Sequence, residues 1–149
     1  MKKIFFVLLF IVASCGYQPL YNTNKEIDKI KISDIKIIGD ISLGKKIYSN
    51  LALKIVKDKS LYKLILNNKK NIVVTSKDSK GQVISYRTTI TVQLSFLDNE
   101  DNLIKDKTLS KDFLYNTKDN KFKLKEYQIE IENNLINKIT EDINIYLKF

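Results

Sequence analysis

The sequence contains no histidine, and Cys15 is its only cysteine. These absences exclude a serine–histidine or cysteine–histidine nucleophile pair and remove the usual zinc ligands. A pair of catalytic carboxylates remains open on composition alone. However, the aspartates and glutamates are scattered over the chain, and no pair is set apart by its surroundings. Solvated surface charge is the simpler interpretation, so we expect a protein that is not an enzyme and holds neither a cofactor nor a metal.

Proline and arginine are also scarce, since Pro19 and Arg87 are single occurrences among 149 residues. Lysine, isoleucine and asparagine are abundant instead, a bias typical of an AT-rich genome, so part of the lysine excess carries no functional meaning. The formal net charge is +9 at pH 7, and a basic surface attracts polyanions such as nucleic acid or phosphate-bearing lipids. A lone cysteine cannot form an intramolecular disulfide, so the fold must be stable on its core alone.

The chain begins with a charged segment followed by an apolar run. Lys2 and Lys3 precede residues 4–13, which are uninterruptedly apolar (IFFVLLFIVA). A membrane-spanning helix needs about 20 apolar residues, so this run is too short to span a bilayer. Its length, its charge and its small-residue end are typical of a secretory signal peptide over residues 1–14. Export argues against a nucleic-acid partner, and removing both lysines lowers the net charge by two, to +7.

The four residues from Val12 to Cys15 (VASC) resemble the bacterial lipobox, in which an aliphatic residue and two small residues precede a cysteine. The resemblance implies that Cys15 becomes the first mature residue, with an N-acyl chain on its amine and S-diacylglycerol on its thiol. Each buried methylene adds about 0.8 kcal/mol of membrane affinity, so two or three chains anchor a protein stably. Gly16 stands where an aspartate would signal inner-membrane retention, which favours an anchor in the outer membrane, on its periplasmic side. The alternatives are an ordinary buried cysteine or an uncleaved anchor.

Residues 15–27 are expected to form the lipidated N-terminus and an extended tether, which contains Pro19. The heptapeptide from Cys15 to Tyr21 (CGYQPLY) is similar to the mature start of the alphaproteobacterial lipopolysaccharide-assembly lipoproteins, the LptE family. That resemblance implies a lipoprotein without enzymatic activity that plugs a large outer-membrane β-barrel, an LptD-like lipopolysaccharide-assembly protein. It would help the barrel assemble and help lipopolysaccharide reach the outer leaflet. The alternative is an envelope lipoprotein adaptor that binds only protein partners.

Hydrophobic periodicity predicts alternating strands and helices behind the tether. Residues 28–38 predict a strand with a bulge at Ser33-Asp34, and Ser42 predicts the cap of a helix over residues 42–57. Residues 61–76 predict one long irregular strand or two short ones, and residues 103–115 predict a further strand. A final amphipathic helix is expected to begin after the capping residues 116–119 and to run to the C-terminus. Its apolar stripe is Leu124, Tyr127, Ile131, Leu135, Ile139, Ile143 and Leu147.

Residues 84–96 give the clearest pattern, because apolar and polar side chains alternate along the whole segment. A period of two predicts a strand with one buried face and one polar face. The expected core residues are Ile84, Tyr86, Thr88, Ile90, Val92, Leu94 and Phe96. The expected residues of the opposite face are Ser85, Arg87, Thr89, Thr91, Gln93 and Ser95.

Together these elements predict an α+β fold, with a single LptE-like α/β domain over residues 28–149. Each expected helix is apolar on one side only, so the economical arrangement is a two-layer sandwich. It would be a four-stranded mixed sheet with two helices packed on one face, in the order β-α-β-β-β-α. The first strand can join either edge of the other three, and the sequence leaves that choice open.

Three basic residues are candidates for contact with lipopolysaccharide: Arg87, Lys80 and Lys105. A guanidinium can bind phosphate through two hydrogen bonds, which makes Arg87 the first choice. The alternative for Arg87 is a cross-strand ion pair with Asp106 or Asp112. The polar face around it suits either a polar barrel lumen or plain solvent.

Overall fold

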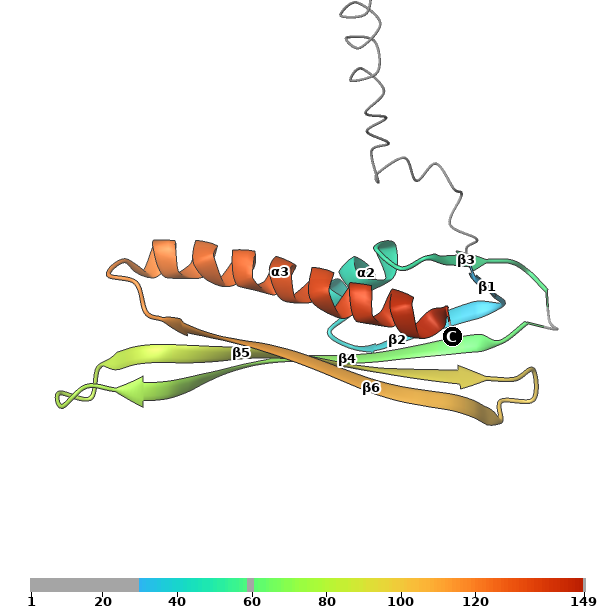
Figure 1. Cartoon of the computed structure of the whole chain (residues 1–149), viewed down its shortest axis with the longest axis horizontal. Helices are drawn as coiled ribbons and strands as arrows, with labels where there is room; N and C mark the ends of the chain where they lie inside the picture. The colour runs from blue at the N-terminus through green and yellow to red at the C-terminus, as the bar shows by residue number, and fades with distance from the viewer. Residues whose placement is uncertain (1–29, 59–60, 149) are drawn as a thin grey trace, which may run out of the picture.

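The computed structural model describes residues 30–58 and 61–148. In chain order these form β1 (Ile30–Ile32), β2 (Asp34–Gly39), α2 (Ile41–Ser49), β3 (Leu53–Ile55), β4 (Lys63–Lys77), β5 (Val83–Leu97), β6 (Leu103–Asn116) and α3 (Lys121–Leu147) (Figure 1). The predicted signal peptide, Cys15 and the tether of residues 15–27 lie outside the described residues.

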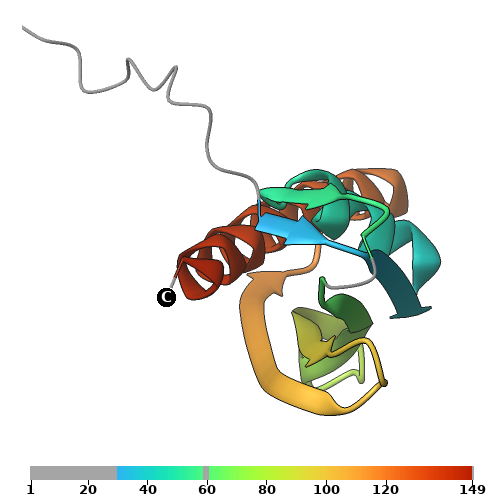
Figure 2. The same cartoon turned by 90° about the vertical axis from the view of Figure 1, so that its right-hand side faces the viewer.

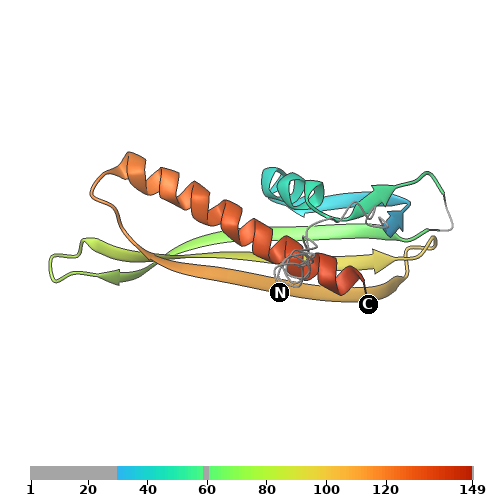
Figure 3. The ribbon, with the colours of Figure 1, turned by 45° about the horizontal axis from the view of Figure 1, so that its top comes forward.

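Four strands form one mixed sheet in the order β2-β4-β5-β6. β2 runs parallel to β4, whereas β4, β5 and β6 form a long antiparallel meander. Both helices lie on one face of this sheet (Figures 1 and 2), α2 over β2 and β4, and α3 obliquely over β5 and β6 (Figure 3). The predicted α+β sandwich is confirmed, and the first strand of the sheet takes the edge beside β4.

The core lies between the helices and the sheet. Its most deeply buried side chains are Ile32, Leu43, Ile47, Leu64, Leu66, Ile90, Val92, Leu94, Ile139 and Ile143. The predicted stripe of α3 faces this core: Ile131, Leu135, Ile139 and Ile143 are buried, and the other members are partly buried. Each fully buried aliphatic side chain contributes about 1.5–3 kcal/mol by leaving water, so the periodicity of α3 fixes how it packs.

The predicted faces of β5 hold over most of the strand. Even-numbered side chains from Thr88 to Phe96 are buried, as the alternation requires. Near the start of the strand, however, Ile84 is exposed and Ser85 is buried. The Ser85 hydroxyl lies 2.7 Å from that of Thr75, where the register between β4 and β5 shifts. A local irregularity therefore reverses the two faces at this end.

The N-terminal strand prediction was wrong in one respect. The expected single strand is divided at Ser33, and its two parts join different sheets. β1 pairs in parallel with β3, from Ile30 opposite Leu53, whereas β2 joins the main sheet. The interruption that the sequence shows at Ser33-Asp34 is thus a change of sheet rather than a bulge.

The first helix is shorter than predicted. α2 ends at Ser49, and Asp40, not Ser42, caps it by accepting a hydrogen bond from the Leu43 amide at 3.0 Å. Beyond Asn50 the chain leaves the helix and pairs as β3 with β1, and Asn144 of α3 accepts a hydrogen bond from the Ala52 amide at 2.9 Å. The expected helix over residues 50–57 is therefore replaced by β3 and its flanking turns.

The final helix also begins slightly later than expected. Its N-cap is Asn120, whose side chain accepts a hydrogen bond from the Phe122 amide at 2.7 Å. Asn116, one of the expected caps, is instead the last residue of β6. The predicted long strand over residues 61–76 is a single strand, β4.

Two glycines allow α2 to approach the sheet closely. Gly39 has φ +92°, and a Cβ there would collide with the carbonyl oxygen of Asn68. A Cβ at Gly44 would press on the side chains of Ile37 and Asn68. Any larger residue at either position would push α2 away from β2 and β4.

Candidate functional site

The face of the main sheet that the helices leave uncovered is the first candidate site, and we call it the open face. It carries the odd-numbered residues of β5 from Arg87 to Ser95, together with their cross-strand neighbours on β4 and β6. Hydroxyl and amide side chains dominate its centre: Asn67, Asn71, Thr89, Thr91, Gln93, Ser95, Thr108 and Ser110. Such a surface can form hydrogen bonds with another polar surface at a low desolvation cost.

Part of the open face is organised around one carboxylate. Asp106 accepts a hydrogen bond from the Ser95 hydroxyl at 2.7 Å and from the Gln93 amide at 3.1 Å. The hydrogen bond from Ser95 and, to a smaller extent, that from Gln93 lower the pKa of Asp106 below its ordinary value. The carboxylate therefore stays ionised and its neighbours are held in place.

Arg87 lies on the open face, as predicted, and forms the cross-strand ion pair that was its alternative role. Its Nε lies 3.5 Å from Oδ2 of Asp112, and each side chain is about half exposed, at 50% and 55%. An exposed pair of this kind contributes about 0–1 kcal/mol. Within residues 30–58 and 61–148 no hydrogen bond engages the terminal guanidinium nitrogens, so they face solvent and can receive an anion.

The other two predicted basic residues do not join Arg87. Lys80 lies in the turn between β4 and β5, and Lys105 pairs with Phe96, nine residues along β5 from Arg87. At 3.4 Å per residue this is about 30 Å. Lys105 lies on the helix-covered face, where its Nζ sits 4.3 Å from the centroid of the Tyr146 ring. The structure therefore does not gather the three candidates into one basic site.

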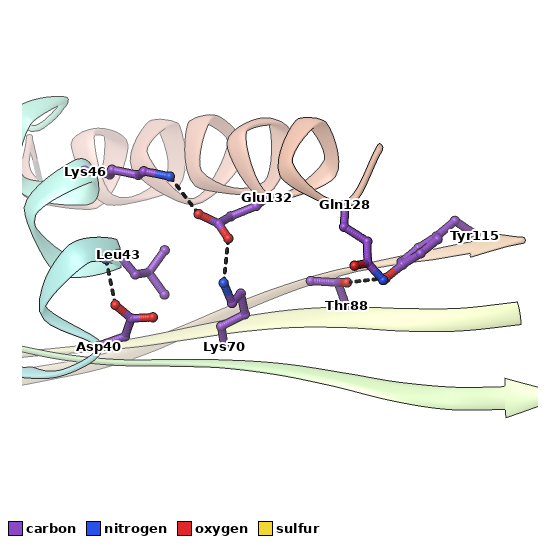
Figure 4. A network of polar contacts seen from close by, with 8 residues as sticks. All are labelled: Asp40, Leu43, Lys46, Lys70, Thr88, Tyr115, Gln128 and Glu132. Atoms are coloured by element: carbon purple, nitrogen blue, oxygen red, sulfur yellow. Dashed lines mark hydrogen bonds and ion pairs between the residues drawn. The ribbon is translucent and has the colours of Figure 1, made fainter. Parts of the chain in front are cut away.

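An ion network that sequence reasoning missed joins three elements. Glu132 of α3 accepts hydrogen bonds from Lys46 of α2 at 2.8 Å and from Lys70 of β4 at 2.6 Å (Figure 4). Partial burial raises the pKa of Glu132, but the two lysines outweigh that effect and the pKa lies below its ordinary value. The side chain of Glu132 is only 14% exposed. Its role is structural, because it fastens both helices to the sheet.

A second buried contact lies where α3 passes over the sheet. The Tyr115 hydroxyl accepts a hydrogen bond from the Gln128 amide at 2.9 Å and lies 3.1 Å from the Thr88 hydroxyl (Figure 4). The ring of Tyr115 also stacks on Tyr86, with 5.7 Å between the centroids. These polar partners allow a threonine and a tyrosine to be buried among apolar side chains.

Two cavities flank α3. One, of about 380 Å³, lies beside β6 and is lined by Phe113, Tyr127 and Ile131 among others. The other, of about 220 Å³, is mainly apolar and is lined by Tyr62, Ile104 and Tyr146, with Lys105 at its wall. Neither cavity brings together a nucleophile and a base among the described residues, so neither is organised as a catalytic site.

Neither a metal site nor a membrane-spanning helix is found in the part of the chain that the structure describes. Within residues 30–58 and 61–148, no three acidic or cysteine side chains gather as a metal site would require. Over the same residues, no helix combines the length and the apolar character needed to cross a bilayer.

The fold is similar to that of bacterial lipoproteins of known structure. A minor lipoprotein from Acinetobacter baumannii matches with a TM-score of 0.57 at 18% identity, over 79% of this chain and 94% of that one. The rare lipoprotein B from Shewanella oneidensis matches with a TM-score of 0.52 at 12% identity, over 78% and 99%. At these identities the likeness establishes the fold alone. No family model and no curated protein matches the sequence.

Proposed function

We propose that this chain is a lipoprotein of the bacterial envelope, anchored in the outer membrane through acyl chains on Cys15. Its folded part would sit as a plug in a large LptD-like β-barrel, assist assembly of that barrel and aid transfer of lipopolysaccharide to the outer leaflet. The lipobox at residues 12–15 supports the anchor, and the fold shared with solved lipoproteins supports the envelope location.

The open face is the observation that carries the barrel proposal. It is broad, uncovered and rich in neutral hydroxyl and amide groups. A porin-like barrel has a polar lumen, and such a wall offers many hydrogen-bonding groups but little apolar surface. The charged side chains of this face are few. Arg87 is paired with Asp112, and Asp106 accepts hydrogen bonds from its neighbours on β5. Docking would therefore leave mainly Lys69 to find a partner in the wall.

Arg87 is the residue that we propose for a lipopolysaccharide phosphate. Its guanidinium is half exposed, and its ion pair with Asp112 at 3.5 Å is weak enough to exchange for a phosphate. Arg87→Asp should weaken binding of purified lipopolysaccharide, whereas Lys36→Asp, a change of equal charge on exposed β2, should leave it unchanged. If both variants bind lipopolysaccharide equally well, Arg87 serves only in its cross-strand ion pair with Asp112.

Depletion in the native host tests the proposed function as a whole. We expect less folded lipopolysaccharide-assembly barrel, and less lipopolysaccharide labelled on the surface of intact cells. Complementation with Cys15→Ser should yield a chain without acyl mass and should restore neither quantity. Normal surface lipopolysaccharide after depletion would contradict the proposal. Co-purification of another envelope complex, with no such barrel, would favour the adaptor function instead.

A further inference from the structure

The outer edge of β4 is paired over only part of its length. β2 lies beside β4 from Asp34 opposite Lys63 to Gly39 opposite Asn68, and there the positive φ of Gly39 turns the chain away into α2. β4 continues to Lys77 (Figure 1). Over residues 69–77, which we call the free edge, the described chain shows no backbone pairing other than with β5. Alternate residues there direct their N–H and C=O groups outward, and none of these groups has a partner among residues 30–58 and 61–148.

The centre of the free edge lacks the features that natural sheets use to block strand addition, since Lys69, Lys70 and Lys77 and the register shift beyond Val74 lie toward its ends. Its centre, Ile72-Val73-Val74, is uncharged and exposed, at 42%, 41% and 45%. β6, at the opposite edge of the sheet, carries Lys107, Lys111 and Asp112 along its length instead. Charges and short strands protect edges, whereas a long apolar edge invites pairing with another strand. The uncharged centre of the free edge is therefore better suited to pairing than β6, whose charges are spread along its length.

An apolar surface accompanies the free edge on the helix side of the sheet. Ile72 pairs with Thr88 and Val74 with Tyr86, which places both on the core-facing side. They remain exposed because α2 covers only the other half of β4. Side chains of an added strand would cover this row.

The charge of β4 indicates the chemistry of the occupant. The strand contains Lys63, Lys69, Lys70 and Lys77 and no acidic residue. Lys69 and Lys77, at the two ends of the free edge, are exposed and take part in no ion pair within the described part of the chain. Suppose that a second copy paired antiparallel with this edge, with the two Val73 residues opposite each other. Lys69 of each copy would then face Lys77 of the other, and like charges directly opposite are destabilising. An occupant with acidic residues near its ends avoids this repulsion.

We propose that the free edge is a strand-addition site that takes an extended segment of another protein, apolar on alternate positions and acidic at its ends. The backbone hydrogen bonds of the free edge supply the affinity. The side chains of Ile72 and Val74 favour a segment with apolar residues at alternate positions, and Lys69 and Lys77 favour one with acidic ends. Strand addition here needs no contact with lipopolysaccharide. An experiment that contradicts this proposal therefore leaves the barrel proposal standing, and the reverse also holds.

The test uses the full-length chain in mild detergent and three synthetic peptides of the length of the free edge. The first alternates valine and threonine between terminal glutamates, the second has a central proline, and the third has terminal lysines. We expect the first peptide to bind at least about tenfold more tightly than the others. It should also slow hydrogen exchange of amides within residues 69–77 and leave those of β6 unchanged.

Charge reversal provides the matched control. The variant Lys69→Glu with Lys77→Glu should prefer the lysine-ended peptide, whereas Lys36→Glu with Lys54→Glu, of the same net charge, should keep the original preference. Three results would overturn the proposal: binding without protection of residues 69–77, protection at β6 instead, or no binding of the first peptide. A concentration-dependent dimer that protects the free edge would identify a second copy as the occupant and would equally overturn it.

Discussion

Replacement of Glu132 by glutamine tests whether the two helices are fastened to the sheet by charge. The carboxylate is 14% exposed and holds Lys46 and Lys70 at 2.8 and 2.6 Å. A hydrogen bond to a charged group contributes about 1.5–3 kcal/mol. The Lys46 contact is discounted to about 0–1 kcal/mol because that lysine is 46% exposed.

The expected cost of Glu132→Gln is therefore about 1.5–4 kcal/mol in the free energy of unfolding. For a chain of this size each kcal/mol lowers Tm by about 2–4 °C. Urea denaturation followed by circular dichroism at neutral pH measures the difference. Glu130→Gln is the matched control, since Glu130 is exposed on α3 and takes part in no ion pair within the described residues. It should change stability by less than about 0.5 kcal/mol.

The pH dependence gives an independent check. The pKa of Glu132 is lowered on folding, so its stabilising effect is complete above the ordinary value of 4.5 and is lost as pH falls through the lower folded-state pKa. The difference in stability between the original chain and Glu132→Gln should shrink as the solution is acidified below that value. A glutamine variant as stable as the original at neutral pH, or a difference independent of pH, would refute this account of the network.

Three further substitutions test the packing and the open face. Ile139→Ala should lower the free energy of unfolding by about 2–5 kcal/mol, because Ile139 is fully buried on the side of α3 that faces the sheet; urea denaturation measures this, and a loss under 1 kcal/mol would contradict the core assignment. Gly44→Ala should destabilise by about 1–3 kcal/mol through collision with Ile37, and a thermal melt at or above the original Tm would show that α2 can shift freely. Arg87→Gln should change stability by no more than about 1 kcal/mol, as expected of an exposed ion pair; a larger loss in the same assay would mean that the pair is structural.

Elements with one unambiguous period were predictable from the sequence. The alternation of β5 and the three- and four-residue steps of α3 each match a single structure, and both were confirmed. Residues 51–56 match two patterns, because Leu51, Leu53 and Ile55 alternate as in a strand, whereas Leu51, Ala52, Ile55 and Val56 continue the helical spacing of α2. The contacts that hold these residues as a strand come from outside the segment: β3 pairs with β1, and the Ala52 amide donates to Asn144, 92 positions away. No local pattern carries such a contact.

The site was less predictable than the fold. Arg87 was placed correctly on the open face because the period of β5 is strict. The position of Lys105 was missed because β6 carries lysines on the face that α3 covers, against the usual expectation that charge faces solvent. Glu132 could not be singled out, since its partners Lys46 and Lys70 lie far away in sequence. The free edge depends on where β2 ends relative to β4, which is a property of the register alone.

The unequal lengths of α2 and of the β4–β5 hairpin make one end of the molecule thick and the other thin (Figure 3). Opening of a folded protein starts where few buried contacts must be broken. The hairpin tip around Val74 and Val83 should therefore open locally more often than the half of the sheet beneath α2. A ligand that rearranges the tip would disturb little of the structure that keeps the chain folded.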